Sequence, residues 1–481
     1  MVSRTFKAVS VILLFCAVSV FGQIYPKGAI LDPEIYEKVP AKPVLLTRDY
    51  AAVPETVSLK RFAPIPGNQN PYGTCVAWAT AFGARTLAES AALGRTDSRI
   101  NTANAFSPAF LWNSAAGDPT GRVGWVIPWA LDFIVREGLV KRQPFEETMD
   151  FLARSPRLFE SLRRYPISGY TRLFSSRLLP GFTEEKVAPV KKSLAEGKPV
   201  IIGMNTPESF YEVGASAIWQ AKTGLWQDRF KVWRPAESPW NRYGGHAMCV
   251  IGYDDNKAGG AFEVLNSWGT NWGGGGFVWI PYEDFANYVN EAYELIENLA
   301  NYRDAVNFGA SIEIEVYQST GGMPVRFNKA GYYETLSLYP SGTEFRFLMT
   351  NRHPAYVYAF SADSKTPGTE RIFPRSGVSP VIDYAGSSIA WPGEFDWIRM
   401  DNVSGTDYLV ILFAKQAIDI DAIERRFAVE KGSLPERVAK AAGPAFIPFG
   451  DVQYDGDEVN FEAVSNDPRA VFALLLAIDH Q

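Results

Sequence analysis

The chain has 481 residues, a net charge of −6, and 47% hydrophobic against 21% charged residues. This composition can fill folded cores and excludes a disordered chain, and the acidic balance argues against a nucleic-acid binder. Three cysteines cannot build a disulfide scaffold. Any chemistry that needs a histidine must choose among His246, His353 and His480. The length predicts two or three domains.

The first 22 residues have the pattern of a signal peptide. Two basic residues open it, and an apolar run from Ala8 to Phe21 follows that is too short to span a bilayer. The small residues Val20 and Gly22 stand where a cleavage site needs them. We therefore expect a protein that is exported to the periplasm or the extracellular space, without stable membrane insertion. A retained N-terminal helix or anchor is the alternative.

The next stretch, residues 23–52, carries several prolines and no sustained period, which predicts an extended lead-in. From residue 53 to about residue 300, helical patterns alternate with short apolar runs. Helices are expected at 75–93, 128–137 and 184–196, the last interrupted at Pro189. Buried strands are expected at 199–203, 247–252 and 262–265, with a glycine turn at 273–276.

The pattern changes after about residue 300 to alternation of polar and apolar residues, which is typical of half-buried strands. Strands are expected at 310–317, 344–349, 355–360, 408–413, 458–462 and 470–478. A helical stretch at 418–442 is expected to break near Gly432 and Pro435. Residues 308–481 are therefore predicted to form a separate β-rich, sandwich-like domain of usual size.

Candidate chemistry is confined to three segments, residues 68–79, 244–254 and 264–273. A cysteine nucleophile needs the pKa of its thiol lowered from about 8.5, which a helix N-terminus and an imidazolium both do. Cys75 opens a predicted helix, and a histidine must activate its thiol and later protonate the leaving amine. A third group must orient the imidazole, and donors must bind the oxyanion. The side-chain amide of Gln69, six residues before Cys75, can point at the same spot as the backbone N–H of Cys75, so that both donate to the oxyanion.

These residues resemble the papain-like cysteine peptidases. The block that begins at Asn266 reads NSWGTNWG and matches the family's Asn-Ser-Trp-Gly-x-x-Trp-Gly, and the order Gln, Cys, His, Asn also matches. The resemblance covers about residues 53–290. Val53–Ser58 looks like the segment that begins the mature enzyme, and residues 121–138 are similar to the stretch that holds the substrate-binding glycine, here Gly124.

The resemblance implies an α+β fold, with a two-lobed papain-like peptidase domain at 53–300 ahead of the β-rich domain. It also implies roles by matching position. Cys75 would be the nucleophile, His246 the general acid and base, and Asn266 the residue that holds the imidazole. Trp268 would shield that hydrogen bond from water, and Gln69 would complete the oxyanion hole. The implied reaction is hydrolysis of peptide bonds in a protein or peptide through a thioester, with no metal or organic cofactor.

The chain departs from the family pattern in several places. Val76 and Tyr72 stand where the family has a tryptophan and a disulfide cysteine. The stretch between Cys75 and His246 exceeds the about 130–150 residues typical of papain-type enzymes, and an insertion at 214–241 accounts for this. The four tryptophans of that insertion fit packing or a substrate cleft equally: Trp219, Trp226, Trp233 and Trp240. The lead-in is too short for a helical inhibitory propeptide, so any autoinhibition must work otherwise.

Two other functions stay open: a catalytically silent papain-like protein that binds a peptide or partner, and a cell-wall amidase or transglutaminase. The intact set of catalytic residue types disfavours the first, and the Asn-Ser-Trp-Gly block disfavours the second. Cys249 is expected to be a silent core thiol, and His353 and His480 surface residues without a role. The acidic stretch at 451–457 lacks the spacing of an EF-hand loop and is expected to be a solvated turn.

The C-terminal half loosely resembles a β-rich domain of unknown function that is appended to bacterial exported proteins. The cues are the segments 355–363, 371–374 and 405–419, none of which is a catalytic motif. We therefore expect this half to be a binding, anchoring or interaction module for an unknown partner.

Overall fold

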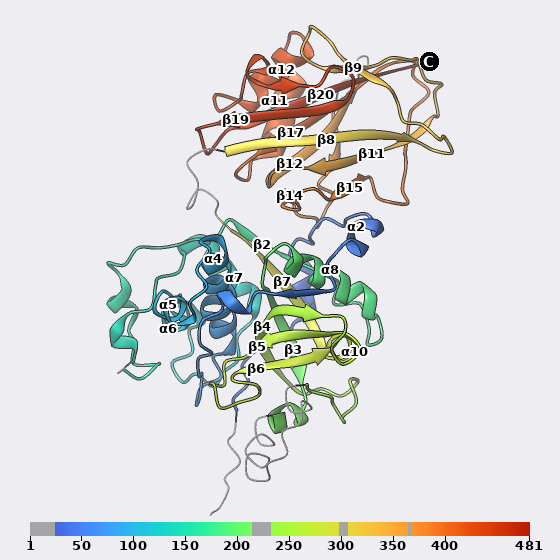
Figure 1. Cartoon of the computed structure of the whole chain (residues 1–481). Coiled ribbons are helices and arrows are strands. Elements are labelled where there is room, and N and C mark those ends of the chain that lie inside the picture. Colours follow the sequence, from blue (N-terminus) through green and yellow to red (C-terminus); the bar gives the residue numbers. More distant parts are fainter. Residues whose placement is uncertain (1–24, 148, 214–231, 298–305, 364–367) are drawn as a thin grey trace, which may run out of the picture.

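The computed structural model describes residues 25–147, 149–213, 232–297, 306–363 and 368–481. The predicted signal peptide, Trp219 and Trp226 lie outside these ranges. The described chain forms two bodies, one of helices and a sheet up to residue 297 and one that is rich in strands from residue 306 (Figure 1). Within the described ranges, every helix is too short or too polar to span a bilayer.

The helical side of the first body is built around the helix that begins at the candidate nucleophile. α3 (Cys75–Ala77) continues through a π-helical stretch, Trp78–Arg85, into α4 (Thr86–Ala92), which confirms the helix predicted at 75–93. Its small residues let it approach the sheet closely, since a Cβ at Gly83 would lie 3.2 Å from the Cβ of Cys249. The other helices of this side are α5 (Ser98–Ala103), α6 (Pro108–Leu111) and α7 (Ile127–Glu137).

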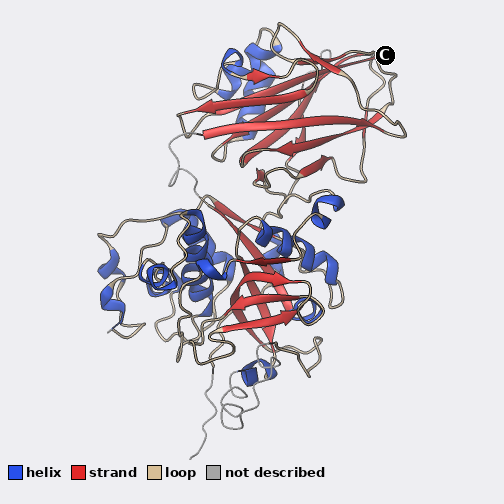
Figure 2. Ribbon diagram, in the orientation of Figure 1, coloured by secondary structure: helices blue, strands red, loops and turns tan. Residues whose placement is uncertain are grey.

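The other side of the first body is an antiparallel sheet, drawn in red in Figure 2. Its strand order is β2 (Gly169–Arg172), β7 (Val289–Ile296), β3 (Val200–Thr206), β4 (Gly244–Asp254), β5 (Ala261–Leu265) and β6 (Phe277–Pro281), with β1 (Thr56–Ser58) beside the end of β4. The three strands predicted in this region are confirmed. Next to this sheet lie α8 (Thr183–Ala195) and α10 (Tyr282–Tyr288).

The predicted interruption of α8 at Pro189 is wrong, because the helix continues through that residue. A proline removes one backbone donor and leaves the carbonyl four residues earlier without its helical partner. Here that residue is Glu185, which is exposed to water. Water can satisfy the carbonyl, and the helix tolerates the proline.

The second body is a sandwich of two sheets, as predicted. The first sheet contains β13 (Glu370–Phe373), β12 (Ala355–Asp363), β17 (Gly405–Ala414), β20 (Val471–His480), β10 (Tyr333–Thr335) and β9 (Val325–Phe327), with β14 (Val381–Ile382) beside β12. The second contains β15 (Ser388–Trp391), β11 (Glu344–Asn351), β8 (Val306–Val316), β19 (Val459–Ser465) and β18 (Gln453–Tyr454), with β16 (Ile398–Arg399) beside β11.

The uninterrupted apolar run at 408–413 lies on β17, which is buried on both faces. Alternate residues point to opposite sides of a strand. Ile411 and Phe413 therefore join the core between the sheets, whereas Val410 and Leu412 pack against α11 (Ile420–Val429) and α12 (Leu434–Ala442). The two helices are separated where Gly432 and Pro435 predicted a break.

The lead-in is not extended throughout, contrary to the prediction. It contains α1 (Pro33–Lys38) and α2 (Thr47–Ala51), and the side chain of Asp32 caps α1 by accepting hydrogen bonds from the N–H groups of Glu34 and Ile35. The capping residue and the proline at the start of α1 are the local signals for this helix.

Candidate active site

The candidate nucleophile lies where the helical side meets the sheet. Cys75 is the first residue of α3, and the N–H of Ala247 on β4 points at its sulfur at 3.4 Å. The N-terminus of a helix carries partial positive charge, which stabilises a thiolate. Because Ala247 follows His246 directly on β4, the strand that approaches the sulfur also carries the candidate base.

His246 is held by a second residue of the predicted set. Its Nε2 lies 2.8 Å from Oδ1 of Asn266, so this nitrogen donates to the amide carbonyl. The other nitrogen, Nδ1, is buried and has no hydrogen-bond partner among the described residues. The ring of Trp268 stacks on the imidazole with centroids 4.5 Å apart and an interplanar angle of 22°. This geometry leaves Nδ1 as the nitrogen that is free to take a proton.

Gln69 is positioned by the turn that carries Asn266. The backbone N–H of Gln69 donates to the carbonyl of Ser267 at 2.8 Å, and the Ser267 hydroxyl donates to Oε1 of Gln69 at 2.6 Å. These bonds hold the side-chain amide so that its NH₂ group points away from the turn. The structure thus brings Cys75, His246, Asn266, Trp268 and Gln69 together from segments that are far apart in the sequence.

The first seven described residues, Tyr25 to Leu31, lie across this site, and we call them the flap. The N–H of Ala29 donates to the carbonyl of Gly245 at 3.1 Å. On the other side, the N–H of Trp125 donates to the Gly28 carbonyl at 2.8 Å, and the N–H of Ile30 donates to the Trp125 carbonyl at 3.0 Å. The flap is therefore hydrogen-bonded along both of its edges, to the strand of His246 and to the segment after Gly124.

Three flap residues occupy positions that a substrate would need. The carbonyl of Pro26 accepts a hydrogen bond of 2.9 Å from Nε2 of Gln69, the donor predicted for the oxyanion hole. A Cβ at Gly124 would lie 2.9 Å from the Ile30 side chain and 3.1 Å from the Gly28 carbonyl. The flap thus covers both the predicted oxyanion donor and the predicted substrate-binding glycine.

The covered site favours the neutral forms of its two titratable groups. Cys75 and His246 are both fully buried. Burial raises the pKa of the Cys75 thiol to about 11, although the N–H groups of Ala247 and Gly28 act against this shift. Burial lowers the pKa of His246 to about 4, helped by the positive charge of Lys27 and opposed by the Asn266 hydrogen bond. With the flap in place, a neutral thiol faces a neutral imidazole.

The flap is the functional segment that the sequence analysis missed. Lys27 bonds the Thr206 carbonyl, and Tyr25 stacks on Trp268 with centroids 4.7 Å apart. One local signal marks the segment: a Cβ at Gly28 would lie 1.6 Å from the Gly73 carbonyl oxygen, so glycine alone fits there. That signal becomes readable only when the position of Gly73 is known.

The remaining candidate residues divide between core and surface. Cys249 is a fully buried thiol whose pKa burial raises, as expected of a core residue. Trp233 is buried and packs on Phe210 and Tyr288, whereas Trp240 is 67% exposed. Among the described residues, no group of three or more His, Cys, Asp or Glu side chains is placed to hold a metal ion.

Comparison with known proteins gave three kinds of result. No family model matches the chain. An uncharacterised peptidase C1-like protein of Acanthamoeba polyphaga mimivirus is 32% identical over 104 residues, which are 22% of this chain and 29% of the viral protein. The chain thus matches less than a third of the length of this relative.

The similar solved structures are cysteine proteases. Xylellain from Xylella fastidiosa is 20% identical and covers 57% of this chain and 96% of its own, with a TM-score of 0.40. Procathepsin B from Trypanosoma congolense is 16% identical and covers 57% and 87%, with a TM-score of 0.41. The peptidase C1-like relative agrees with the predicted resemblance to the papain-like cysteine peptidases over the 104 residues that it matches.

Proposed function

We propose that this chain is a cysteine peptidase that uses Cys75, His246 and Asn266 to hydrolyse peptide bonds in a protein or peptide. One observation carries the proposal. A buried imidazole is hydrogen-bonded to Asn266 through one nitrogen, keeps the other nitrogen free, and lies on the strand that contacts a cysteine at a helix N-terminus. A purely structural histidine at this depth would be expected to have both nitrogens satisfied.

The chemistry follows from these positions. The thiol proton of Cys75 passes to Nδ1 of His246 as the sulfur attacks the substrate carbonyl carbon. The oxyanion accepts hydrogen bonds from Nε2 of Gln69 and the N–H of Cys75. His246 then protonates the leaving amine, which leaves a thioester on Cys75. Water, deprotonated by the same imidazole, hydrolyses the thioester and restores the thiol.

Asn266 keeps the imidazole in the useful tautomer throughout, because its carbonyl accepts the Nε2 proton. Trp268 covers the ring from one face and limits the access of water to that hydrogen bond. The flap must leave before a substrate can bind, since its own carbonyl already occupies the Gln69 amide.

We further propose that the protein is exported to the periplasm or the extracellular space. The proposal is supported by the basic start, the short apolar run and the small residues that end at Gly22. Mass analysis of the N-terminus of the protein recovered from its native host tests it. A chain that retains residues 1–22 would overturn the proposal.

The activity is tested on a full chain that carries a recognition sequence for a specific protease inserted between Leu31 and Asp32. After cutting, an epoxide thiol inhibitor is added and a denatured protein is offered as substrate. We expect labelling of Cys75 and fragmentation of the substrate, both abolished in Cys75→Ala and retained in the matched variant Cys249→Ala. The absence of both labelling of Cys75 and fragmentation of the substrate would refute the peptidase proposal. Labelling without cleavage would favour the peptide-binding alternative.

A further inference from the structure

The lead-in beyond the flap is built into both bodies of the molecule. We call residues 32–51 the tie. At Ala41, the backbone is hydrogen-bonded on two sides. Its N–H donates to Gly377 and its carbonyl accepts from Ser379, while the neighbouring N–H of Lys42 donates to Arg172 of β2. A single residue of the lead-in thus lies between an edge strand of the first body and a loop of the second.

The end of the tie belongs to the core of the second body. Leu45 is 1% exposed within the core between the two sheets, where it pairs with Ile389 of β15. The N–H of Leu46 donates to the Ser388 carbonyl at 3.1 Å, and the N–H of Ser388 donates to the carboxylate of Asp49 at 2.8 Å. A side chain that completes a core is expensive to remove, because its withdrawal leaves a cavity.

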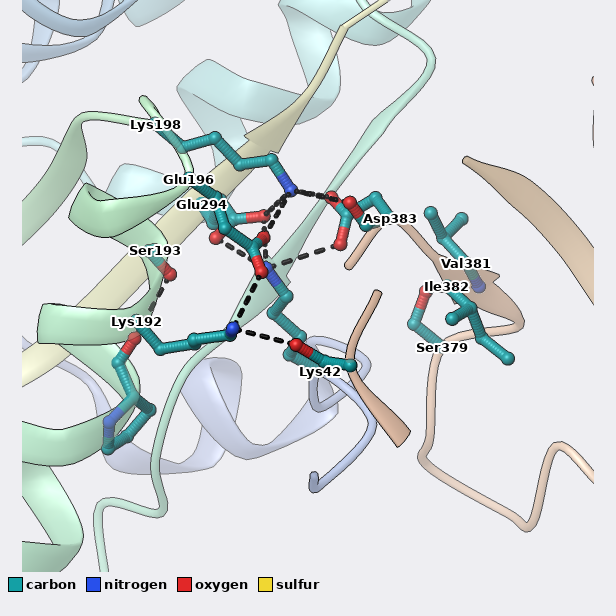
Figure 3. Close-up of polar contacts among 12 residues, drawn as sticks. Lys42, Lys192, Ser193, Glu196, Lys198, Glu294, Ser379, Val381, Ile382 and Asp383 are labelled. Carbon is teal, nitrogen blue, oxygen red and sulfur yellow. Dashed lines mark hydrogen bonds and ion pairs between the residues drawn. The ribbon is translucent and has the colours of Figure 1, made fainter. Parts of the chain in front are cut away.

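A buried ion cluster fastens the tie where the two bodies meet (Figure 3). Nζ of Lys42 lies 2.5 Å from Glu294 of β7 and 3.2 Å from Asp383 of the second body. Lys198 bridges the same two carboxylates, at 3.1 Å and 2.5 Å. Charges that are buried together in this way are costly to separate, because each would lose its partners without regaining water. Lys42 is the member of this cluster that the tie supplies.

The start of the tie is fixed to the first body. Its Asp32 N–H donates to Glu291 at 3.1 Å. The Tyr36 side chain is fully buried, and its hydroxyl donates to the Phe174 carbonyl at 2.8 Å. The guanidinium of Arg172 donates to the Val39 carbonyl at 3.0 Å and pairs with Glu37 at 3.2 Å. The whole length from Asp32 to Asp49 is therefore anchored by buried or charged contacts.

The flap and the tie differ in the contacts that would have to break for each segment to dissociate. The flap has no side chain in the core of the second body and contributes no charge to the cluster, and the stretch that joins it to the tie is partly exposed, with Ile30, Pro33 and Glu34 facing solvent. We propose that the tie is a permanent joint between the two bodies and that only the flap leaves the active site. Any cut that frees the site then falls at residues 30–34, not before Val53, where the resemblance places the start of the mature enzyme. The inference rests on the proposed function only in treating the covered residues as an active site.

Two versions of the full chain test this. One carries a specific protease site between Leu31 and Asp32, and the other carries it between Ala52 and Val53, in an exposed turn. Each is cut and passed over a size-exclusion column, and the bound pieces are weighed by mass spectrometry. The alkylation rate of Cys75 by iodoacetamide is measured in a Cys249→Ala background. None of these measurements requires that this chain hydrolyse a peptide. An inactive peptidase and a tie that dissociates therefore give different results.

After the first cut we expect the flap to be lost and alkylation of Cys75 to accelerate at least a hundredfold. After the second cut we expect the piece that ends at residue 52 to co-elute with the rest of the chain and Cys75 to stay protected. The proposal is overturned if the piece that ends at residue 52 departs on its own, or if the flap remains bound after the first cut.

A pair of lysine variants of the second version tests which contacts hold the tie. Lys42→Met removes the positive charge that the tie contributes to the buried ion cluster. Lys38→Met makes the same change at an exposed position of α1. We expect the cut piece to dissociate at least tenfold faster with Lys42→Met than with Lys38→Met. Equal rates would overturn the role of the buried cluster in holding the two bodies together.

Discussion

The two bodies each bury one histidine, and the surroundings of the two rings differ. His246 bonds Asn266 through Nε2 and leaves Nδ1 without a partner among the described residues. His480 is equally buried, at 1% side-chain exposure, but both of its nitrogens are used. Nδ1 lies 3.2 Å from the Ser341 hydroxyl, and Nε2 lies 3.5 Å from the carboxylate of Asp407. The prediction that His480 is a surface residue is therefore wrong.

The hydrogen-bond partners of a buried histidine help to distinguish a chemical role from a structural one. A buried polar atom that lacks a partner costs free energy, and a fold keeps such an atom where it has a use. A fully partnered buried ring, in contrast, stabilises the chain that surrounds it. The comparison agrees with the proposed chemical role of His246 and with a structural role for His480, and substitution of each residue tests both roles.

The largest expected effect is the loss of activity in His246→Ala. If His246 is the proposed base and acid, its removal should lower kcat/KM by about 10⁴-fold or more. Initial rates of peptide hydrolysis by the flap-free chain measure it. His480→Ala is the matched control and should leave kcat/KM within about twofold, because its ring is remote from the reacting atoms. Comparable losses in both variants would erase the distinction between the two histidines.

The next effect concerns the oxyanion. Gln69→Ala removes one donor and should lower kcat by about 10²–10³-fold, with a smaller change in KM. The substitution also removes the bond to Ser267, so Ser267→Ala is needed to separate the two losses. Ser267→Ala keeps the donor and should lower kcat by less than about tenfold. Equal effects of the two variants would mean that Gln69 acts only by fixing the turn.

Several features of the site could be predicted because they are local in the sequence. Cys75, His246 and Asn266 stand within short motifs whose spacing identifies them without any knowledge of the fold. The strands of the second body were also predictable, because period-two alternation and the apolar run of β17 follow from which faces are buried. Where these signals are strong, the predicted and observed ranges coincide closely.

The flap could not be predicted for the opposite reason. It pairs through backbone groups with Gly245 and the segment at Trp125, and backbone pairing with such distant partners leaves no periodic pattern. A proline-rich stretch without a period predicts an extended lead-in, and it gives no sign of α1, α2 or the burial of Leu45. Nearness to the C-terminus predicts exposure for His480, whereas β20 carries this residue into the interior.

The third effect is a pH dependence of flap opening. With the flap closed, the pKa of His246 is about 4, against an ordinary value of 6.5. If His246 has its ordinary pKa when the flap is open, the open form binds a proton between pH 6.5 and pH 4 that the closed form does not bind. Acid should therefore favour opening as the pH falls from 6.5 toward 4. Between pH 7 and pH 4 the open fraction should rise on the order of a hundredfold. The ratio of Cys75 alkylation rates in intact and flap-free chains measures it, because the intrinsic reactivity of the thiol cancels.

Lys27→Met should flatten the acid-induced opening, because it removes a flap charge that lowers the pKa of His246. A rate ratio that is constant from pH 7 to pH 4 in both the unsubstituted and the Lys27→Met chains would show that protonation of His246 is not linked to the flap.

The smallest effect tests the structural assignment of His480. His480→Ala leaves the Ser341 hydroxyl and the Asp407 carboxylate without their buried partner, which should lower the free energy of unfolding of the second body by about 1–3 kcal/mol. Urea unfolding followed by near-UV circular dichroism measures it. His353→Ala is the control, because that side chain is 33% exposed and faces Glu462 at 3.5 Å, and its removal should change stability by less than about 0.5 kcal/mol. If His480→Ala also changes the free energy of unfolding by less than about 0.5 kcal/mol, the fully partnered imidazole does not stabilise this sandwich. Satisfied hydrogen bonds could then not distinguish the role of His480 from that of His246.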